Sequence, residues 1–154
     1  AHTTKFDAIP NFALAAFGGH LLGADRGEWG GELVFRDNDG IIHRLIDRNV
    51  HGIVRMPFGV VVFTGLAHLS QSTGAIYRVD QHPDGTVTAT LLHTLPGAPE
   101  DIRWTTRGDL VFRVVTHEAH RFGLFNSRGS GTRCLRLARS GMVQNQLCMA
   151  IIDR

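Results

Sequence analysis

The chain has 154 residues, of which 43% are hydrophobic and 19% are charged, so its composition is that of a globular domain with a sizeable core rather than of a disordered segment. A formal net charge of +2 is too small to indicate a nucleic-acid-binding protein, and no apolar run reaches the ~18 residues of a membrane-spanning helix. We therefore expect residues 1–154 to form a single domain without a nucleic-acid or membrane partner.

The first predicted repeat covers residues 12–47. An apolar strand leads to a turn at Phe17-Gly18, and after a second strand a polar loop at 25–30 ends before Gly31. A third strand starts there and reaches the tight turn Asp-Asn-Asp-Gly at 37–40, in which Asn and Gly tolerate the positive φ that hairpins need. A fourth strand completes the repeat.

The second predicted repeat, residues 52–94, has the same order of parts. Its turn is at Phe58-Gly59, its polar loop covers 68–73, and Gly74 precedes the third strand. The fourth strand contains residues 86–91, in which apolar residues alternate with threonine. Such a two-residue period is typical of a strand with one buried face.

The third predicted repeat, residues 101–138, has its turn at Arg107-Gly108, its polar loop at 116–121 and the corresponding glycine at Gly123. A final apolar segment, 142–152, is expected to form a closing strand. Each repeat thus consists of four predicted antiparallel strands, and helical patterns are almost absent.

Antiparallel four-stranded repeats at intervals of roughly 40 to 50 residues resemble the blades of a β-propeller. The resemblance lies in the order of strands and turns and includes no family-specific motif. Because propellers usually need four or more blades to close a ring, the three repeats predict an all-β, partial and compact propeller-like fold. A β-sandwich built from the same hairpins is the alternative.

The three polar loops are longer than the two to five residues that a hairpin connection needs. Equivalent positions in stacked repeats share a face, so we predict a binding surface made of these loops. Trp29 beside Arg26 has the composition of an interface anchor, although Trp29 could instead fold back over the core. The candidate binding residues are Asp25, Arg26, Glu28, Trp29, His68, Gln71, His117, Glu118, His120 and Arg121.

The densest group of metal-binding residue types is His-Glu-Ala-His at 117–120. Zinc peptidases need two histidines four residues apart on a helix, whereas here they are three apart in a segment without helical character. The turn at 37–40 lacks the other ligands of a calcium loop, because Phe35 and Ile46 stand where Asp and Glu are required. We therefore expect no metal and no cofactor.

No sequence motif for catalysis is present: there is no serine nucleophile elbow, phosphate-binding loop or dinucleotide fingerprint. The nearest group of acidic residues could supply a carboxylate pair that hydrolyses glycosides, if two members faced each other across a cleft. These residues are Asp25, Glu28, Glu32 and Asp39.

The two cysteines, Cys134 and Cys148, lie close together near the C-terminus. We predict a disulfide that joins the closing strand to the fourth strand of the third repeat, with two buried thiols in a reducing compartment as the alternative. The chain also begins with Ala1 rather than Met, as a processed protein would, although a tag remnant would look the same. Both features favour a periplasmic or secreted protein.

These features together predict a non-enzymatic exported recognition domain that binds another protein through its loops. A short, blade-like exported chain is similar in kind to the periplasmic immunity proteins that block cell-wall amidase toxins of type VI secretion. That resemblance implies an inhibitor or immunity protein. The alternative is a hydrolase with carboxylates or histidines gathered at the same loop face.

Overall fold

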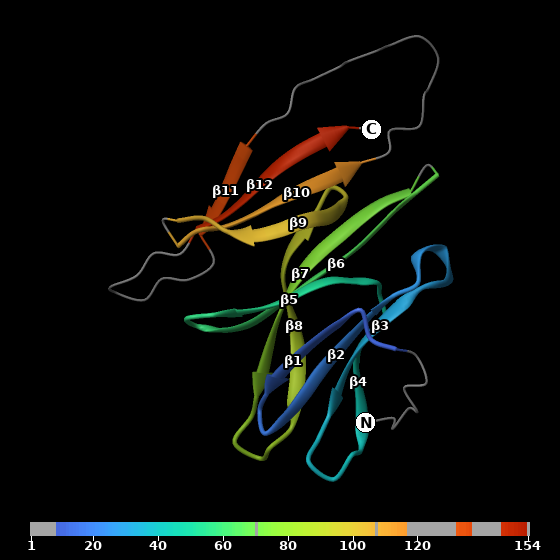
Figure 1. The fold of residues 1–154 in the computed structure, drawn as a ribbon, viewed down its shortest axis with the longest axis vertical. Helices are drawn as coiled ribbons and strands as arrows, with labels where there is room; N and C mark the ends of the chain where they lie inside the picture. The colour runs from blue at the N-terminus through green and yellow to red at the C-terminus, as the bar shows by residue number, and fades with distance from the viewer. Residues whose placement is uncertain (1–8, 70, 107, 117–131, 137–145, 154) are drawn as a thin grey trace. The chain divides into compact units, whose positions relative to one another are not determined.

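The computed structural model describes residues 9–69, 71–106, 108–116, 132–136 and 146–153, with the backbone alone for the last two ranges. These residues form twelve strands and one short 3-10 helix, and the strands make three four-stranded sheets (Figure 1). The predicted all-β class is therefore confirmed. No closed barrel or propeller is formed by the described residues.

The first sheet is an antiparallel meander of four strands in chain order. They are β1 (Phe12–Ala16), β2 (Gly19–Asp25), β3 (Gly31–Arg36) and β4 (Ile42–Ile46). The turn between β1 and β2 consists of Phe17 and Gly18, with φ of 56° and 75°. Two consecutive positive φ values are those of the type I′ turn that closes a two-residue hairpin.

The second sheet also keeps its strands in chain order. They are β5 (Val50–Met56), β6 (Gly59–His68), β7 (Gln71–Gln81) and β8 (Val87–Leu95). In β6 the consecutive residues Val60, Val61, Val62 and Phe63 are all buried, although neighbours in a strand point to opposite faces. Both faces of this strand are therefore covered, which explains its uninterrupted apolar sequence.

The third sheet departs from the expected order. Its strands are β9 (Ala98–Trp104), β10 (Leu110–Thr116), β11 (Thr132–Arg136) and β12 (Gln146–Asp153), arranged as β11-β12-β10-β9. The predicted closing strand, 142–152, supplies β12, which lies between β10 and β11 and runs parallel to β10. The expectation of purely antiparallel pairing is thus wrong for this sheet, because the closing strand is inserted rather than added at its edge. The strand predicted at 124–125 lies outside the described residues.

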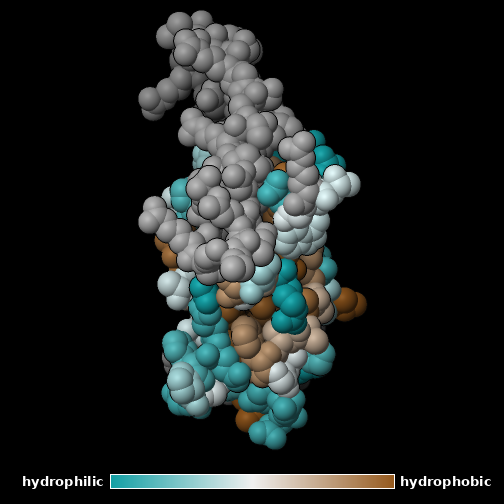
Figure 2. Space-filling model, turned by 90° about the vertical axis from the view of Figure 1, so that its left-hand side faces the viewer, coloured by the Kyte–Doolittle hydropathy of each residue, from teal (hydrophilic) through white to brown (hydrophobic). Residues whose placement is uncertain are grey.

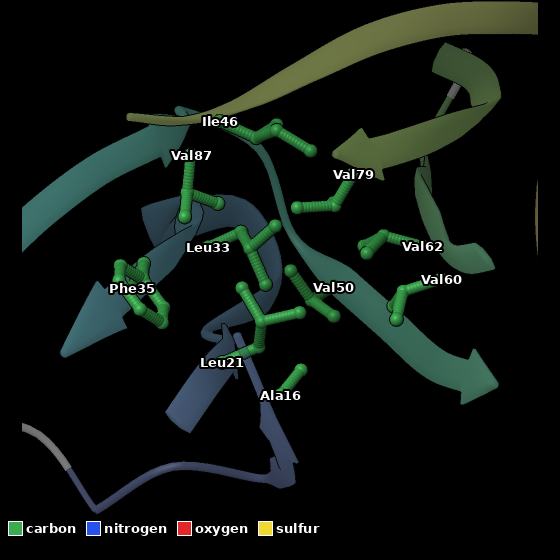
Figure 3. Close-up of a cluster of buried hydrophobic side chains, with 10 residues drawn as sticks. All are labelled: Ala16, Leu21, Leu33, Phe35, Ile46, Val50, Val60, Val62, Val79 and Val87. Atoms are coloured by element: carbon green, nitrogen blue, oxygen red, sulfur yellow. The ribbon is translucent and has the colours of Figure 1, made fainter. Parts of the chain in front are cut away.

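The chain divides into two compact units. The first contains residues 1–65 and 75–94, and the second contains 66–74 and 95–154. In the first unit β5 lies against β1, β2 and β3, so the first two sheets share a core. The side chains of this core point toward one another (Figure 3); they are Ala16, Leu21, Leu33, Phe35, Ile46, Val50, Val60, Val62, Val79 and Val87.

The glycine predicted before the third strand has a steric role in the first two repeats. A Cβ on Gly31 would lie 2.2 Å from the carbonyl oxygen of Ala24 and 2.6 Å from Cα of Asn49, which directly precedes β5. A Cβ on Gly74 would lie 1.9 Å from the carbonyl oxygen of Gly97, which directly precedes β9. In both repeats the glycine leaves room for the chain that enters the next sheet. Gly123 lies outside the described residues.

The register of β11 and β12 places Cys134 directly opposite Cys148. Directly opposite residues of antiparallel strands have Cα atoms about 4.5 to 5.5 Å apart, a separation that a disulfide can span. The two sequence positions are thus brought together by the sheet itself.

We therefore predict that native protein contains the Cys134–Cys148 disulfide. Intact-mass measurement should show no alkylation of native material, and two alkyl groups per chain once the protein has been reduced. A variant with both cysteines changed to serine should show the same mass under both conditions. Two thiols that alkylate in native, unreduced protein would contradict the bond.

Candidate functional site

The loop between β2 and β3, residues 26–30, is called the Trp29 loop below. It contains the 3-10 helix η1 (Gly27–Trp29). The backbone N–H of Trp29 donates to the carbonyl of Arg26 at 3.1 Å, and that of Gly30 donates to the carbonyl of Gly27 at 3.1 Å. Gly27 and Gly30 have φ of 58° and 80°, values that are strained for other residues. Both glycines thus take part in a tight helical turn.

Two polar side chains hold the Trp29 loop in place. The side-chain oxygen of Asn49 accepts from the N–H of Arg26 at 3.1 Å, and its nitrogen donates to the carbonyl of Gly27 at 2.7 Å. Asp25 Oδ1 accepts from the N–H of Gly27 at 2.9 Å. Asn49 is only 5% exposed and lies just before β5, so it fastens the loop to the neighbouring sheet of the first unit.

An ion-pair cluster around a buried carboxylate lies at the start of β3. The side chain of Glu32 is 9% exposed and contacts two arginines. Arg44 Nη2 is 2.9 Å from Glu32 Oε2, Arg44 Nε donates to the same oxygen at 3.0 Å, and Arg26 Nη2 is 3.5 Å from Oε1. Since burial of an unpaired carboxylate is costly, the two guanidinium groups stabilise Glu32 in this position. Arg26, predicted as a binding anchor, thus also has an internal partner.

Trp29 projects from this fixed loop into solvent. It is 82% exposed, so it does not cover the core, which was the alternative left open by the sequence. Glu28 is also exposed on η1, and Asp25 is partly buried beneath the loop. Figure 2 shows one face of the molecule, on which brown hydrophobic residues are exposed among teal hydrophilic ones. A large aromatic side chain that is mostly exposed on a rigid turn has the features of a contact residue.

The second predicted loop does not exist as such. β6 continues to His68 and β7 begins at Gln71, so two residues connect them instead of the polar stretch 68–73. The segment is polar enough to suggest a loop, but polar side chains are also accommodated by strands of an extended hairpin that face water. His68 and Gln71 are therefore strand residues at the tip of a hairpin. The third loop, with His117, Glu118, His120 and Arg121, lies outside the described residues.

The turn at 37–40 is held by the side chain of Asp37. Its Oδ1 accepts from the N–H groups of Asp39 at 3.0 Å and Ile41 at 2.9 Å, and its Oδ2 is 2.9 Å from His43 Nε2. The hydrogen bond to His43, together with those from the backbone, lowers the pKa of Asp37 below its ordinary value of 3.8. Asp37 thus has a structural role in a hairpin turn.

Among the described residues, no group of three or more His, Cys, Asp or Glu is placed to hold a metal ion, and no helix has the length and apolarity to cross a membrane. No protein-family model matches the chain, nor does any curated protein or solved structure at a significant level. Support for a function therefore comes from the residues of the chain itself, above all those of the Trp29 loop.

Proposed function

We propose that this chain is a non-enzymatic recognition domain, periplasmic or secreted, that binds a protein partner with Trp29 as its main anchor. The observation that carries the proposal is the combination of an 82% exposed tryptophan with a backbone fixed by Asn49, Asp25 and two glycines. Tryptophan is enriched among the residues that dominate binding energy, because it fills a large pocket in the partner.

The rigidity of the Trp29 loop favours tight binding. A flexible loop loses conformational entropy when it is ordered by a partner, and this loss reduces affinity. In the Trp29 loop the backbone is already ordered by hydrogen bonds from Arg26, Gly27 and Gly30, so only the side chain of Trp29 has to be immobilised.

The finer proposal is that the partner is an enzyme inhibited by this chain, as in the immunity proteins that the sequence resembles in kind. The hydrolase alternative has less support among the described residues. Glu32 is buried against Arg26 and Arg44, and Asp25 accepts a hydrogen bond from the loop backbone. Both side chains therefore have structural partners within the first unit.

Trp29→Ala should weaken partner binding by about 2 kcal/mol, a roughly thirtyfold increase in Kd, while the melting temperature stays nearly unchanged. The partner would be obtained by co-purification with tagged wild-type chain from the native cell, and its affinity measured by titration calorimetry. Trp104→Ala, which removes the other tryptophan, in β9, is the matched control and should retain binding.

The opposite pattern would contradict this assignment. If Trp29→Ala lowered stability by about 3 kcal/mol, as loss of a core aromatic does, and left affinity unchanged, Trp29 would be a structural residue. Loss of binding in Trp104→Ala but not in Trp29→Ala would place the interface elsewhere on the chain.

A further inference from the structure

The outer edge of the second sheet is an uncharged strand. β8 is the last strand in the order β5-β6-β7-β8, and its sequence, VTATLLHTL, contains no Asp, Glu, Lys, Arg or Pro. Residues 90–94 are all exposed, and Leu91 and Leu92, which point to opposite faces, are 51% and 37% exposed. An edge strand presents N–H and C=O groups without a ladder partner, which are available to another strand.

The other sheet edges among the described strands are protected against such pairing. β1 is five residues long, and the carbonyl of Ala15 in it accepts a hydrogen bond from Arg55. β5 carries Arg55 itself and lies against the first sheet, and β4 is a five-residue strand that carries Arg44. β9 contains Pro99 and acidic residues, and β11 contains two arginines. Short length, proline and charge are the features that keep natural edges from pairing, and β8, with nine residues, has none of them.

The sequence of β8 is complementary to itself in antiparallel orientation. With Leu91 opposite Leu91 of a second copy, Thr88 faces Thr94, Ala89 faces His93 and Thr90 faces Leu92. The Thr88–Thr94 pair is of a favourable cross-strand type, the two Leu91 side chains place apolar surface against apolar surface, and no side chains of like charge meet.

We propose that β8 is a homodimer interface, in which the β8 strands of two copies pair antiparallel about Leu91 and join their sheets. An isologous interface requires a surface that is complementary to itself, and this strand meets that condition both in its side-chain pairs and in its lack of charge. The proposal does not depend on Trp29: Trp29→Ala should leave self-association unchanged, so failure of either proposal can be recognised separately.

Sedimentation equilibrium over a range of protein concentrations tests the interface. Wild-type protein should form dimers, whereas Leu91→Lys and Leu91→Asp should each lower the association constant at least about tenfold, because like charges then face each other. An equimolar mixture of the two variants should dimerise again, since lysine would face aspartate. Ile41→Lys and Ile41→Asp, at an exposed position beside β4, are the matched controls and should associate as wild type does.

Hydrogen exchange of unmodified protein gives a second measurement in case a charged variant does not fold. The amides of residues 87–95 should exchange more slowly as the protein concentration rises into the dimeric range, while those of β1 should not change. A wild-type chain that stays monomeric, a mixture that does not recover association, or exchange in β8 that is independent of concentration would each overturn the interface.

Discussion

Replacement of Gly31 with alanine is expected to lower the free energy of unfolding by about 4 kcal/mol or more, one of the largest effects of any single methyl group in this chain. The added Cβ would lie 2.2 Å from the carbonyl oxygen of Ala24, 2.5 Å from Oδ1 of Asn49 and 2.6 Å from Cα of Asn49. Two of these three atoms belong to the backbone, so the clash cannot be relieved by rotation of a side chain. Denaturant unfolding followed by circular dichroism measures the loss.

Gly40→Ala is the matched control for this prediction. Gly40 has a φ of 78°, so alanine is disfavoured there by its backbone conformation, but no atom lies within 4 Å of the added Cβ. The expected cost is about 1 kcal/mol, that of a left-handed conformation alone. Equal losses in the two variants would mean that Ala24 and Asn49 can move away from a Cβ at position 31 at little cost.

The contrast between these glycines shows which parts of the fold could be predicted from the sequence. Gly18, Gly40 and Gly85 have positive φ in turns between strands, and short-range rules identify such turns because the requirement is local. The need for Gly31 arises from Ala24 on the neighbouring strand and from Asn49, 18 residues away, and the place of this glycine in the repeat was apparent although these contacts were not. The repeated order of strands was therefore predictable, whereas the packing that requires it was not.

Long-range pairing accounts for the parts that were not predicted. The insertion of β12 between β10 and β11 depends on sheet contacts that no local pattern specifies. Residues 71–73 are polar, yet they belong to β7 because the β6–β7 hairpin extends to its tip. For the site, the sequence left open whether Trp29 is exposed, and the ion pairs of the buried Glu32 with Arg26 and Arg44 were not predicted. The signal that could have indicated them is an acidic residue on one predicted strand with a basic residue on the next.

Arg44→Met is expected to lower the free energy of unfolding by about 3 kcal/mol, because it removes the closest counter-charge of a buried carboxylate. Methionine keeps much of the apolar stem of the arginine side chain, so the change acts mainly on charge. Glu32, whose side chain is 9% exposed, would be left with Arg26 alone, at 3.5 Å. Chemical denaturation at neutral pH gives the difference from wild type.

Asp47→Asn is the control for this cluster, because it removes a different charge partner of the same arginine. Asp47 lies 3.8 Å from Arg44 and its side chain is 80% exposed, so water stabilises either charge without the other. The loss should stay below about 0.5 kcal/mol, as for exposed ion pairs in general.

The double variant Arg44→Met/Glu32→Gln separates the cost of an unpaired buried charge from the value of the ion pair. A neutral amide at position 32 needs no counter-charge, so the double variant should be more stable than Arg44→Met alone, by about 2 kcal/mol. Additive losses in the double variant would show that Arg44 stabilises β3 and β4 by packing rather than through Glu32. In that case the Trp29 loop would depend on Asn49 for its fixed conformation. Asn49→Ala would then be expected to increase the hydrogen exchange rate of the Trp29 and Gly30 amides, whereas Arg44→Met would leave that rate unchanged.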